Sequence, residues 1–249
     1  CDYEEHKSNV DSFFETDSQF QKIVQEIKST SPSKNNCIAL FSGGKDSTYM
    51  LYQLVENELS PLVFTLDNGY ISEQAKQNIQ RVVTDLQLEH VFASTPGMNE
   101  IFAESLKVFS DVCNGCFKTI YTLSTKLALE RGIGSIFTGL SSGQLVDTRL
   151  GEYYKKPDFK TERIDDLIIE ARKLYHRMDD AVSRCIDTSI FEDDDTFKKV
   201  TFVDYYRYHD VPLESLYSYL DSNAPWVRPS DTGRSTNCKI NDAGIYIHK

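Results

Sequence analysis

Residues 41–47, with the sequence FSGGKDS, carry the most specific chemical signal in the chain. Glycines allow the backbone to approach a ligand closely, and a helix that follows directly offers unpaired N–H groups with a positive partial charge. Lys45 adds a full positive charge, and Ser42 and Ser47 add hydroxyl donors. The segment is not a Walker A motif, because Lys45 precedes Asp46 rather than Ser or Thr. We therefore expect an anion such as a phosphate group to bind here.

Cysteines form the second group of chemically capable residues, and the chain has six of them. Cys113 and Cys116 form a CxxC pair at or just before the start of a predicted helix, where the positive N-terminus is expected to lower the pKa of a thiol. Such a thiol would be a good nucleophile or metal ligand. Structural zinc is not expected, because there is no second CxxC or His pair at zinc spacing. We expect Cys37 and Cys185 to be core residues.

The elements that must position these groups alternate along the chain. Short apolar runs predict strands at residues 37–41, 62–66, 90–94 and 135–140. Apolar residues at helical spacing predict helices at residues 17–28, 48–58, 98–109, 117–130 and 163–177, and another that Ser72 caps. This alternation predicts an α/β fold with a doubly wound, mostly parallel sheet and helices on both faces, in which ligands bind at the carboxyl ends of the strands.

Composition and charge limit the kinds of partner. The 249 residues include 27 Lys and Arg against 38 Asp and Glu, a net charge of −11, so a phosphate-rich polymer would meet an unfavourable overall field. The contents of hydrophobic residues, 40%, and charged residues, 26%, exclude disordered, collagen-like and coiled-coil chains. The sequence shows no membrane-length apolar stretch and no secretion-signal pattern, so we expect a cytoplasmic protein without a membrane partner. Because the chain starts at Cys1, we expect that it has been trimmed.

The phosphate-binding segment resembles that of the PP-loop ATP pyrophosphatases, also called the N-type or adenine nucleotide alpha-hydrolase-like family, whose signature SGGxDS follows the first strand. The match is complete at Ser42, Gly43, Gly44, Asp46 and Ser47. The resemblance implies a Rossmann-like fold of the HUP type. It divides the chain into an N-terminal helical segment (1–34), a PP-loop domain (35–150) and a mainly helical C-terminal extension (151–249) for substrate and sulfur.

The same resemblance implies roles for individual residues. The loop, with Lys45, would hold the pyrophosphate that leaves when ATP adenylates a substrate oxygen, and Asp46 would help to place Mg²⁺. Leu66 and Asp67 at the end of the second strand would meet the adenosine, although Asp67 could equally close a turn. Gly139 after the fourth strand would allow a close approach to the nucleotide.

The cysteines are similar to those of the tRNA 2-thiocytidine and 2-thiouridine synthetases, which carry CxxC after the third strand and a third cysteine much later. Cys238 is the candidate for that third position, beside Cys113 and Cys116. The resemblance implies one of two arrangements. Three thiolates could hold a [4Fe–4S] cluster with one open iron for sulfide, or one cysteine could carry a persulfide that another resolves as a disulfide.

After the fourth strand the chain departs from many tRNA-modifying relatives, which have Gly-His and then an acidic pair. Leu140 stands where the His is expected, Gly and Gln at 143–144 replace the acidic pair, and only Asp147 resembles the later acid. We therefore expect a substrate pocket unlike that of the tRNA enzymes. Asp147, Arg228 and Arg234 are candidates for binding the substrate, since arginine suits phosphates and planar amides.

Together these features predict an ATP-dependent sulfurtransferase. It would adenylate a carbonyl or lactam oxygen of a small molecule, for example a purine such as guanine, release pyrophosphate, and exchange the oxygen for sulfur with release of AMP. The segments CNGCF and RPSDTGRSTNC are most similar to those of bacterial thioamide- or 6-thioguanine-forming enzymes. The expected partners are the small acceptor and a cysteine desulfurase or other sulfur donor, and a homodimer is an option.

Three alternatives stay open at this point. The first is tRNA thiolation, which the cysteine pattern favours and the acidic charge opposes. The second is ATP-dependent amide formation like that of the sugar amidotransferases, in which ammonia takes the place of sulfur. The third is a nucleotide-binding regulatory module without catalysis.

Overall fold

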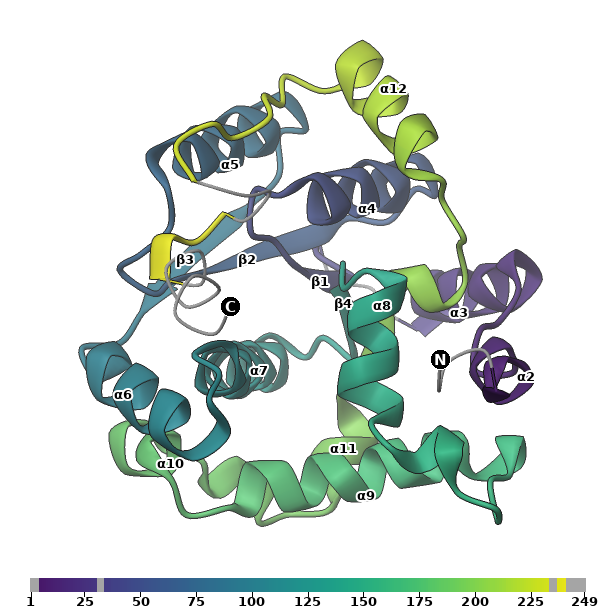
Figure 1. Cartoon of the computed structure of the whole chain (residues 1–249). Helices are drawn as coiled ribbons and strands as arrows, with labels where there is room; N and C mark the ends of the chain where they lie inside the picture. Colours follow the sequence, from purple (N-terminus) through teal and green to yellow (C-terminus); the bar gives the residue numbers. More distant parts are fainter. Residues whose placement is uncertain (1–4, 31–33, 233–236, 241–249) are drawn as a thin grey trace.

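The computed structural model describes residues 5–30, 34–232 and 237–240, and Figure 1 shows how its elements are arranged. Its centre is a five-stranded sheet in which all neighbouring strands are parallel. The strands are β1 (Cys37–Leu40), β2 (Pro61–Asp67), β3 (His90–Ser94), β4 (Ser135–Thr138) and β5 (Thr201–Asp204). Their spatial order is β3-β2-β1-β4-β5, so the direction of winding reverses next to β1.

Helices connect the strands and cover the sheet. Before and between the first four strands lie α2 (Lys7–Asp11), α3 (Asp17–Thr30), α4 (Lys45–Glu56), α5 (Glu73–Asp85), α6 (Met98–Phe109) and α7 (Cys113–Arg131). After β4 come α8 (Ser142–Leu145), α9 (Ile164–Arg177), α10 (Ala181–Cys185), α11 (Asp195–Lys199) and, after β5, α12 (Leu213–Asn223). A π-helical turn (Val146–Leu150) continues α8. No helix in the described ranges is long and apolar enough to cross a membrane.

Alternate residues of the central strands pack against opposite layers of helices. Ala39 and Val63 belong to a core shared with α3, α4, α5 and α12. Ile38 and Leu62 belong to a core shared with α6, α7 and α10. Figure 1 shows α4 and α5 on one side of the sheet and α6 and α7 on the other. Strands buried on both faces are apolar throughout their length, and this pattern underlies the predicted doubly wound α/β fold, which the structure confirms.

The structure differs from the prediction in the segment after residue 150. The sequence does not predict β5 (Thr201–Asp204), which pairs with β4 in parallel register. The strand has only four residues, of which two are buried. Four residues are too few to show a recognisable alternation of apolar and polar positions. Because this strand completes the sheet, the predicted division at residue 150 runs through the elements that build it.

Two helices begin earlier than the apolar pattern indicates. Helix α4 starts at Lys45 rather than at Thr48, and α7 starts at Cys113 rather than at Phe117. The first turn of a helix often lacks the apolar residues that reveal the rest of it, because its side chains face the ligand site or solvent. As a consequence, Lys45 and Asp46 lie in the first turn of α4, and Cys113 and Cys116 lie in the first turn of α7.

Candidate active site

A cavity of about 330 Å³ lies at the carboxyl ends of the strands, between the starts of α4 and α7. Ligands of open parallel sheets bind at this edge, where the winding reverses. We call it the loop–cysteine cavity, because ten of the residues singled out in the sequence line it. These are Ser42, Gly44, Lys45, Asp46, Ser47, Leu66, Cys113, Cys116, Gly139 and Cys238.

The backbone of residues 42–47, the candidate phosphate-binding loop, follows a path that glycine makes accessible. Gly43 has φ +74°, and a Cβ added to it would lie 2.6 Å from the carbonyl oxygen of Ala75 in α5. Its own carbonyl accepts a hydrogen bond of 2.9 Å from the indole Nε1–H of Trp226. The helix that follows has Gly44 at its N-cap and no side chain bonded there, so its first N–H groups remain available to an anion.

The charged residues of the loop pair with each other. Lys45 Nζ lies 2.5 Å from Asp46 Oδ2, and both side chains are about one quarter exposed. The backbone carbonyl of Asp46 accepts a hydrogen bond of 3.0 Å from the Tyr206 hydroxyl, which fixes the first turn of α4. A lysine and a carboxylate beside free helix N–H groups fit MgATP, because lysine binds phosphate oxygens and magnesium takes carboxylate and phosphate oxygens.

A short C-terminal segment, residues 237–240, crosses the cavity beside the loop. Asn237 Nδ2 donates to Ser42 Oγ over 3.2 Å, and its carbonyl accepts a bond of 2.9 Å from the Ser72 N–H. Cys238 forms an antiparallel bridge with Ile71. Sequence reasoning did not find Asn237, because its position beside the loop depends on a contact between residues 195 positions apart.

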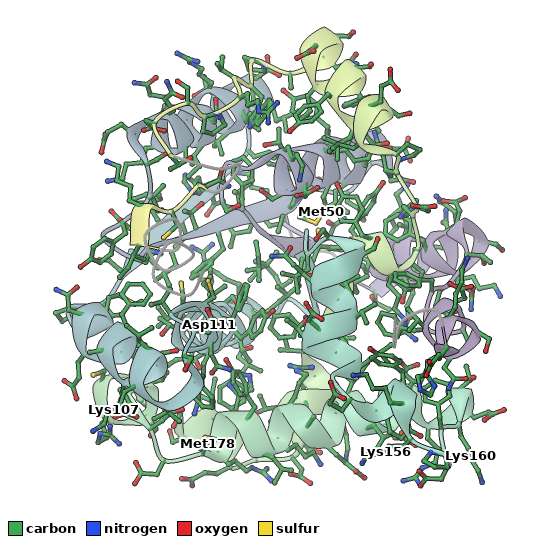
Figure 2. The ribbon with its side chains drawn as sticks, viewed as in Figure 1. Met50, Lys107, Asp111, Lys156, Lys160 and Met178 are labelled. Atoms are coloured by element: carbon green, nitrogen blue, oxygen red, sulfur yellow. The ribbon has the colours of Figure 1, made fainter. Side chains whose placement is uncertain are left out.

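All three cysteines of the proposed sulfur site face this cavity. The side-chain amide of Asn68, which follows β2, donates to Cys116 Sγ over 3.6 Å and to Cys238 Sγ over 3.5 Å. Asp111 Oδ1 accepts a bond of 2.9 Å from the Cys113 N–H at the start of α7. Figure 2 shows Asp111 beside this helix. The Asn68 amide therefore joins the CxxC pair to the distant third cysteine.

The predicted lowering of the thiol pKa values is wrong. Burial raises the pKa of Cys116 to about 12, against a smaller opposing effect of the Asn68 hydrogen bond. Burial also raises the pKa of Cys113, and the negative charge of Asp111 adds to the effect. The helix N-terminus does not prevail because desolvation disfavours the thiolate and because Asp111 already occupies the first N–H of α7.

Cys113, Cys116 and Cys238 are also the candidates for an iron–sulfur centre. In the parts of the chain that the structure describes, no group of three or more His, Cys, Asp or Glu side chains is arranged to hold a metal ion. We therefore derive no step through an iron–sulfur cluster at Cys113, Cys116 and Cys238, and such a cluster stays a prediction.

Gly139 and Asp67 have different surroundings. A Cβ added to Gly139 would lie 2.9 Å from Ser47 Cα, so the glycine lets the end of β4 approach the start of α4. Asp67 Oδ1 accepts a bond of 3.0 Å from the Gly69 N–H, and its carboxylate lies 3.9 Å from Lys76 Nζ. Asp67 thus closes the turn after β2 and is not among the residues that line the cavity.

The three substrate candidates do not line the loop–cysteine cavity. Asp147 lies exposed at a second cavity, described below. Arg228 is exposed and its guanidinium lies 5.4 Å from the centre of the Tyr217 ring. Arg234 is outside the described residues. Their roles in substrate binding stay predictions.

Comparisons with known proteins give a curated relative and several solved structures of similar fold. No protein-family profile matches the chain. An uncharacterised protein of Methanocaldococcus jannaschii, MJ1599, is 28% identical over 122 residues, which are 49% of this chain and 43% of that protein. The chain thus spans less than half the length of this curated relative.

Two solved structures are similar at low identity. An NH3-dependent NAD synthetase from Campylobacter jejuni gives a TM-score of 0.40 at 14% identity, covering 71% of this chain and 94% of that one. An NMN synthetase from Francisella tularensis gives a TM-score of 0.39 at 14% identity, covering 84% of this chain and 96% of that one.

Proposed function

We propose that this protein is an ATP-dependent enzyme that adenylates a carbonyl or lactam oxygen of a small molecule and replaces that oxygen with sulfur. One observation carries the proposal. A phosphate-binding loop and three cysteine thiols, which come from segments far apart in the sequence, line a single cavity. A site for nucleotide alone would not need the thiols, and a redox pair alone would not need the loop.

In the proposed reaction, residues 42–47 and the start of α4 serve the first step, the adenylation of the substrate. The substrate oxygen attacks the α-phosphorus of ATP, and pyrophosphate leaves with its charge stabilised by the N–H groups at the start of α4 and by Lys45. Asp46 would hold Mg²⁺ once phosphate oxygens draw Lys45 away from its carboxylate. The product is a carbon activated by an AMP leaving group.

The cysteines serve the second step, the transfer of sulfur. An external persulfide donor transfers one sulfur atom to a thiol of the CxxC pair, and the terminal sulfur attacks the activated carbon, releasing AMP. A second cysteine then attacks the first cysteine's sulfur, forming a disulfide and releasing the thiocarbonyl product. An external thiol must return two electrons to reduce this disulfide. The Asn68 amide lies where it can stabilise negative charge on either Cys116 or Cys238.

The size and charge of the protein support a small acceptor. The cavity volume of about 330 Å³ is that of a small-molecule site. The net charge of −11 opposes binding to a nucleic acid. These observations favour a small acceptor over tRNA.

The proposal is tested by following both products on one set of variants. The wild-type protein, loaded with persulfide sulfur, is incubated with MgATP and a series of lactams that includes guanine. We expect release of AMP and pyrophosphate and formation of a thiocarbonyl product, which mass spectrometry detects. Cys113→Ser and Cys116→Ser should abolish the thiocarbonyl product.

The matched control is Cys185→Ser, because Cys185 lies outside the cavity and packs against Gly97. It should leave both products unchanged. If both CxxC variants still release pyrophosphate and incorporate ammonia, the protein forms amides and does not transfer sulfur. Tight, salt-dependent RNA binding would instead favour tRNA thiolation, and nucleotide binding without turnover would favour a regulatory module.

A further inference from the structure

A second cavity of about 360 Å³ lies between α7, α9, the π-helical turn Val146–Leu150 and Phe202 of β5. We call it the arginine cavity, because Arg149 and Arg172 both line it. The rings of Phe117 and Tyr121 line both cavities and stack with their centres 6.1 Å apart. The two cavities therefore share these two aromatic side chains in their walls.

The charge of Arg149 is matched within the protein. Its Nε and Nη2 donate to the two carboxylate oxygens of Asp204 over 2.7 and 2.8 Å. Asp204 also accepts a bond of 2.5 Å from the Thr138 hydroxyl, and Arg149 keeps the pKa of this buried carboxyl below its ordinary value despite burial. Such a two-pronged contact satisfies both partners.

The charge of Arg172 is not matched in the same way. Its guanidinium lies over the Phe202 ring, 4.4 Å from the centre. No group in the described part of the chain accepts a hydrogen bond from it or forms an ion pair with it. Burial and the nearby Arg149 lower its pKa to about 10, so the side chain remains charged at neutral pH. A guanidinium with five donors and no acceptor favours an anion.

His176 adds a second unsatisfied group one helical turn from Arg172. It is 1% exposed, it lines the arginine cavity, and neither ring nitrogen has a hydrogen-bond partner. Its ring stacks on Phe191 with the centres 3.9 Å apart. Burial lowers the pKa of His176 to about 3, with Arg172 and Lys118 adding to the effect, so the ring is neutral and offers one N–H donor.

The remaining charges near the cavity do not cancel that of Arg172. Asp147 lines it but is exposed, and no contact joins its carboxylate to either arginine. Lys118 is held 2.6 Å from Asp180. Leaving a buried donor without an acceptor costs about 1–3 kcal/mol, and a ligand that accepts from the buried His176 ring would recover this free energy.

We propose that the arginine cavity binds an anionic group, a carboxylate or a phosphate, through Arg172 and His176. If the proposed function holds, this group belongs to the acceptor, whose reacting carbonyl would reach past Phe117 and Tyr121 into the loop–cysteine cavity. The acceptor would then be an acidic small molecule rather than a neutral purine base. The anion site itself depends only on the contacts described here.

The test uses three ring compounds that differ in charge. Benzoate, phenyl phosphate and neutral benzamide are titrated by calorimetry into the full-length protein with MgATP present to occupy the phosphate loop. We expect at least one anion to bind about tenfold or more tightly than benzamide, because a hydrogen bond to a charged group adds that much affinity. Whether benzoate or phenyl phosphate binds more tightly shows whether the site prefers a carboxylate or a phosphate.

Variants connect this binding to the cavity. Arg172→Met keeps most of the packing over Phe202 and should reduce the affinity for the anion about tenfold or more, to that of benzamide. Arg172→Lys keeps the charge and should retain a preference for the anion. The matched control Arg163→Met removes an exposed charge just before the same helix and should change nothing.

Equal binding of anions and benzamide, binding that Arg172→Met leaves unchanged, or no binding of any probe at millimolar concentration would overturn the proposal. MgATP binding is measured separately on each variant. Loss of nucleotide binding with intact, Arg172-dependent anion binding would contradict the proposed function and leave the anion site standing. Turnover of an acceptor by a protein that shows no preference for the anions over benzamide would overturn the anion site and leave the proposed function standing.

Discussion

Two helices begin at the loop–cysteine cavity, and their first turns differ in chemistry. At the start of α4, Gly44 leaves the helix N–H groups open, and hydroxyls and Lys45 surround them. At the start of α7, Asp111 accepts a hydrogen bond from the first N–H, and the thiols are partly buried. A helix N-terminus favours a negative charge only while its N–H groups remain available and solvent or cations assist. The α4 start is therefore suited to a phosphate, and the α7 start keeps its thiols protonated.

The difference between the two helix starts also affects the order of steps in the proposed reaction. Because the thiolate is the reactive form, buried cysteines with raised pKa values are poor nucleophiles toward compounds in solution. In the proposed reaction they acquire sulfur from a donor before they meet the activated carbon. In the proposed reaction the loop, by contrast, binds its ligand through N–H groups that are already open, and Lys45 must only move from Asp46 to the phosphates.

The pH dependence of alkylation is the strongest test of the α7 start. Between pH 7 and pH 10, the rate at which iodoacetamide modifies Cys116 should rise about tenfold per unit, or about a thousandfold in all, because burial holds its pKa at about 12 and only the thiolate reacts. The rate is measured by mass spectrometry of the Cys116 peptide. Free cysteine, which levels off near its own pKa, is the control. A plateau below pH 9 would show that the helix N-terminus dominates after all.

Gly43→Ala should disrupt the α4 start. The added methyl group meets the Ala75 carbonyl at a positive φ, so the free energy of unfolding should fall by about 2–4 kcal/mol and MgATP binding should be lost. Urea denaturation measures the stability and calorimetry the binding. Gly143→Ala is the matched control, because no atom lies within 4 Å of its added Cβ. Equal behaviour of the two variants would contradict the described loop geometry.

Lys45→Met should weaken nucleotide binding without unfolding the protein. Loss of one charged hydrogen-bond donor to the phosphates should raise the dissociation constant for MgATP about tenfold to a hundredfold. Calorimetric titration provides the measurement. Lys126→Met removes a lysine that is about as exposed as Lys45, is paired with Asp187 and lies outside the cavity, and it should have no effect. If both variants bind MgATP like the wild type, Lys45 does not contact the phosphates.

Asp111→Asn should remove a negative charge from the start of α7, which would then favour an anion more, as the start of α4 does. Asp111 raises the pKa of Cys113, so removal of its charge should lower that pKa and speed alkylation of Cys113 at pH 7.5 by about threefold to tenfold. The asparagine can still accept the Cys113 N–H bond. Asp179→Asn changes an exposed carboxylate paired with Arg184 and serves as the control. An unchanged rate would mean that burial alone sets the reactivity of Cys113.

Much of the fold was predictable because its signals are local. The apolar runs of β1 and β2 and the spacing in α5 and α6 appear in short stretches of sequence, and β3 and α6 have the predicted bounds. Ser72 caps α5 as expected, accepting a bond from the Ala75 N–H. In contrast, β5 has too few buried residues to be recognised, and it becomes a strand through its pairing with β4.

The sequence predicted which residue types form the candidate site, but it did not predict the side chains that surround them. The loop and the three cysteines could be selected by motif and spacing, and the structure brings them to one cavity. Asn68, Asn237 and Trp226 could not be selected, since each acts through a contact with a residue distant in the chain. The unmatched charge of Arg172 is likewise invisible in the sequence, where it is one arginine of an amphipathic helix.

The sequence by itself determined the α/β alternation, the glycine-rich loop at residues 42–47 and the spacing of the cysteines, because each depends on neighbouring residues or on a fixed spacing. Only the tertiary structure decided the pKa values of the thiols, the place of the C-terminal segment beside the loop, and the pairing of Arg149 but not Arg172. These properties depend on burial and on which charges meet across long separations in the chain. Both are set by packing, which a linear pattern does not record.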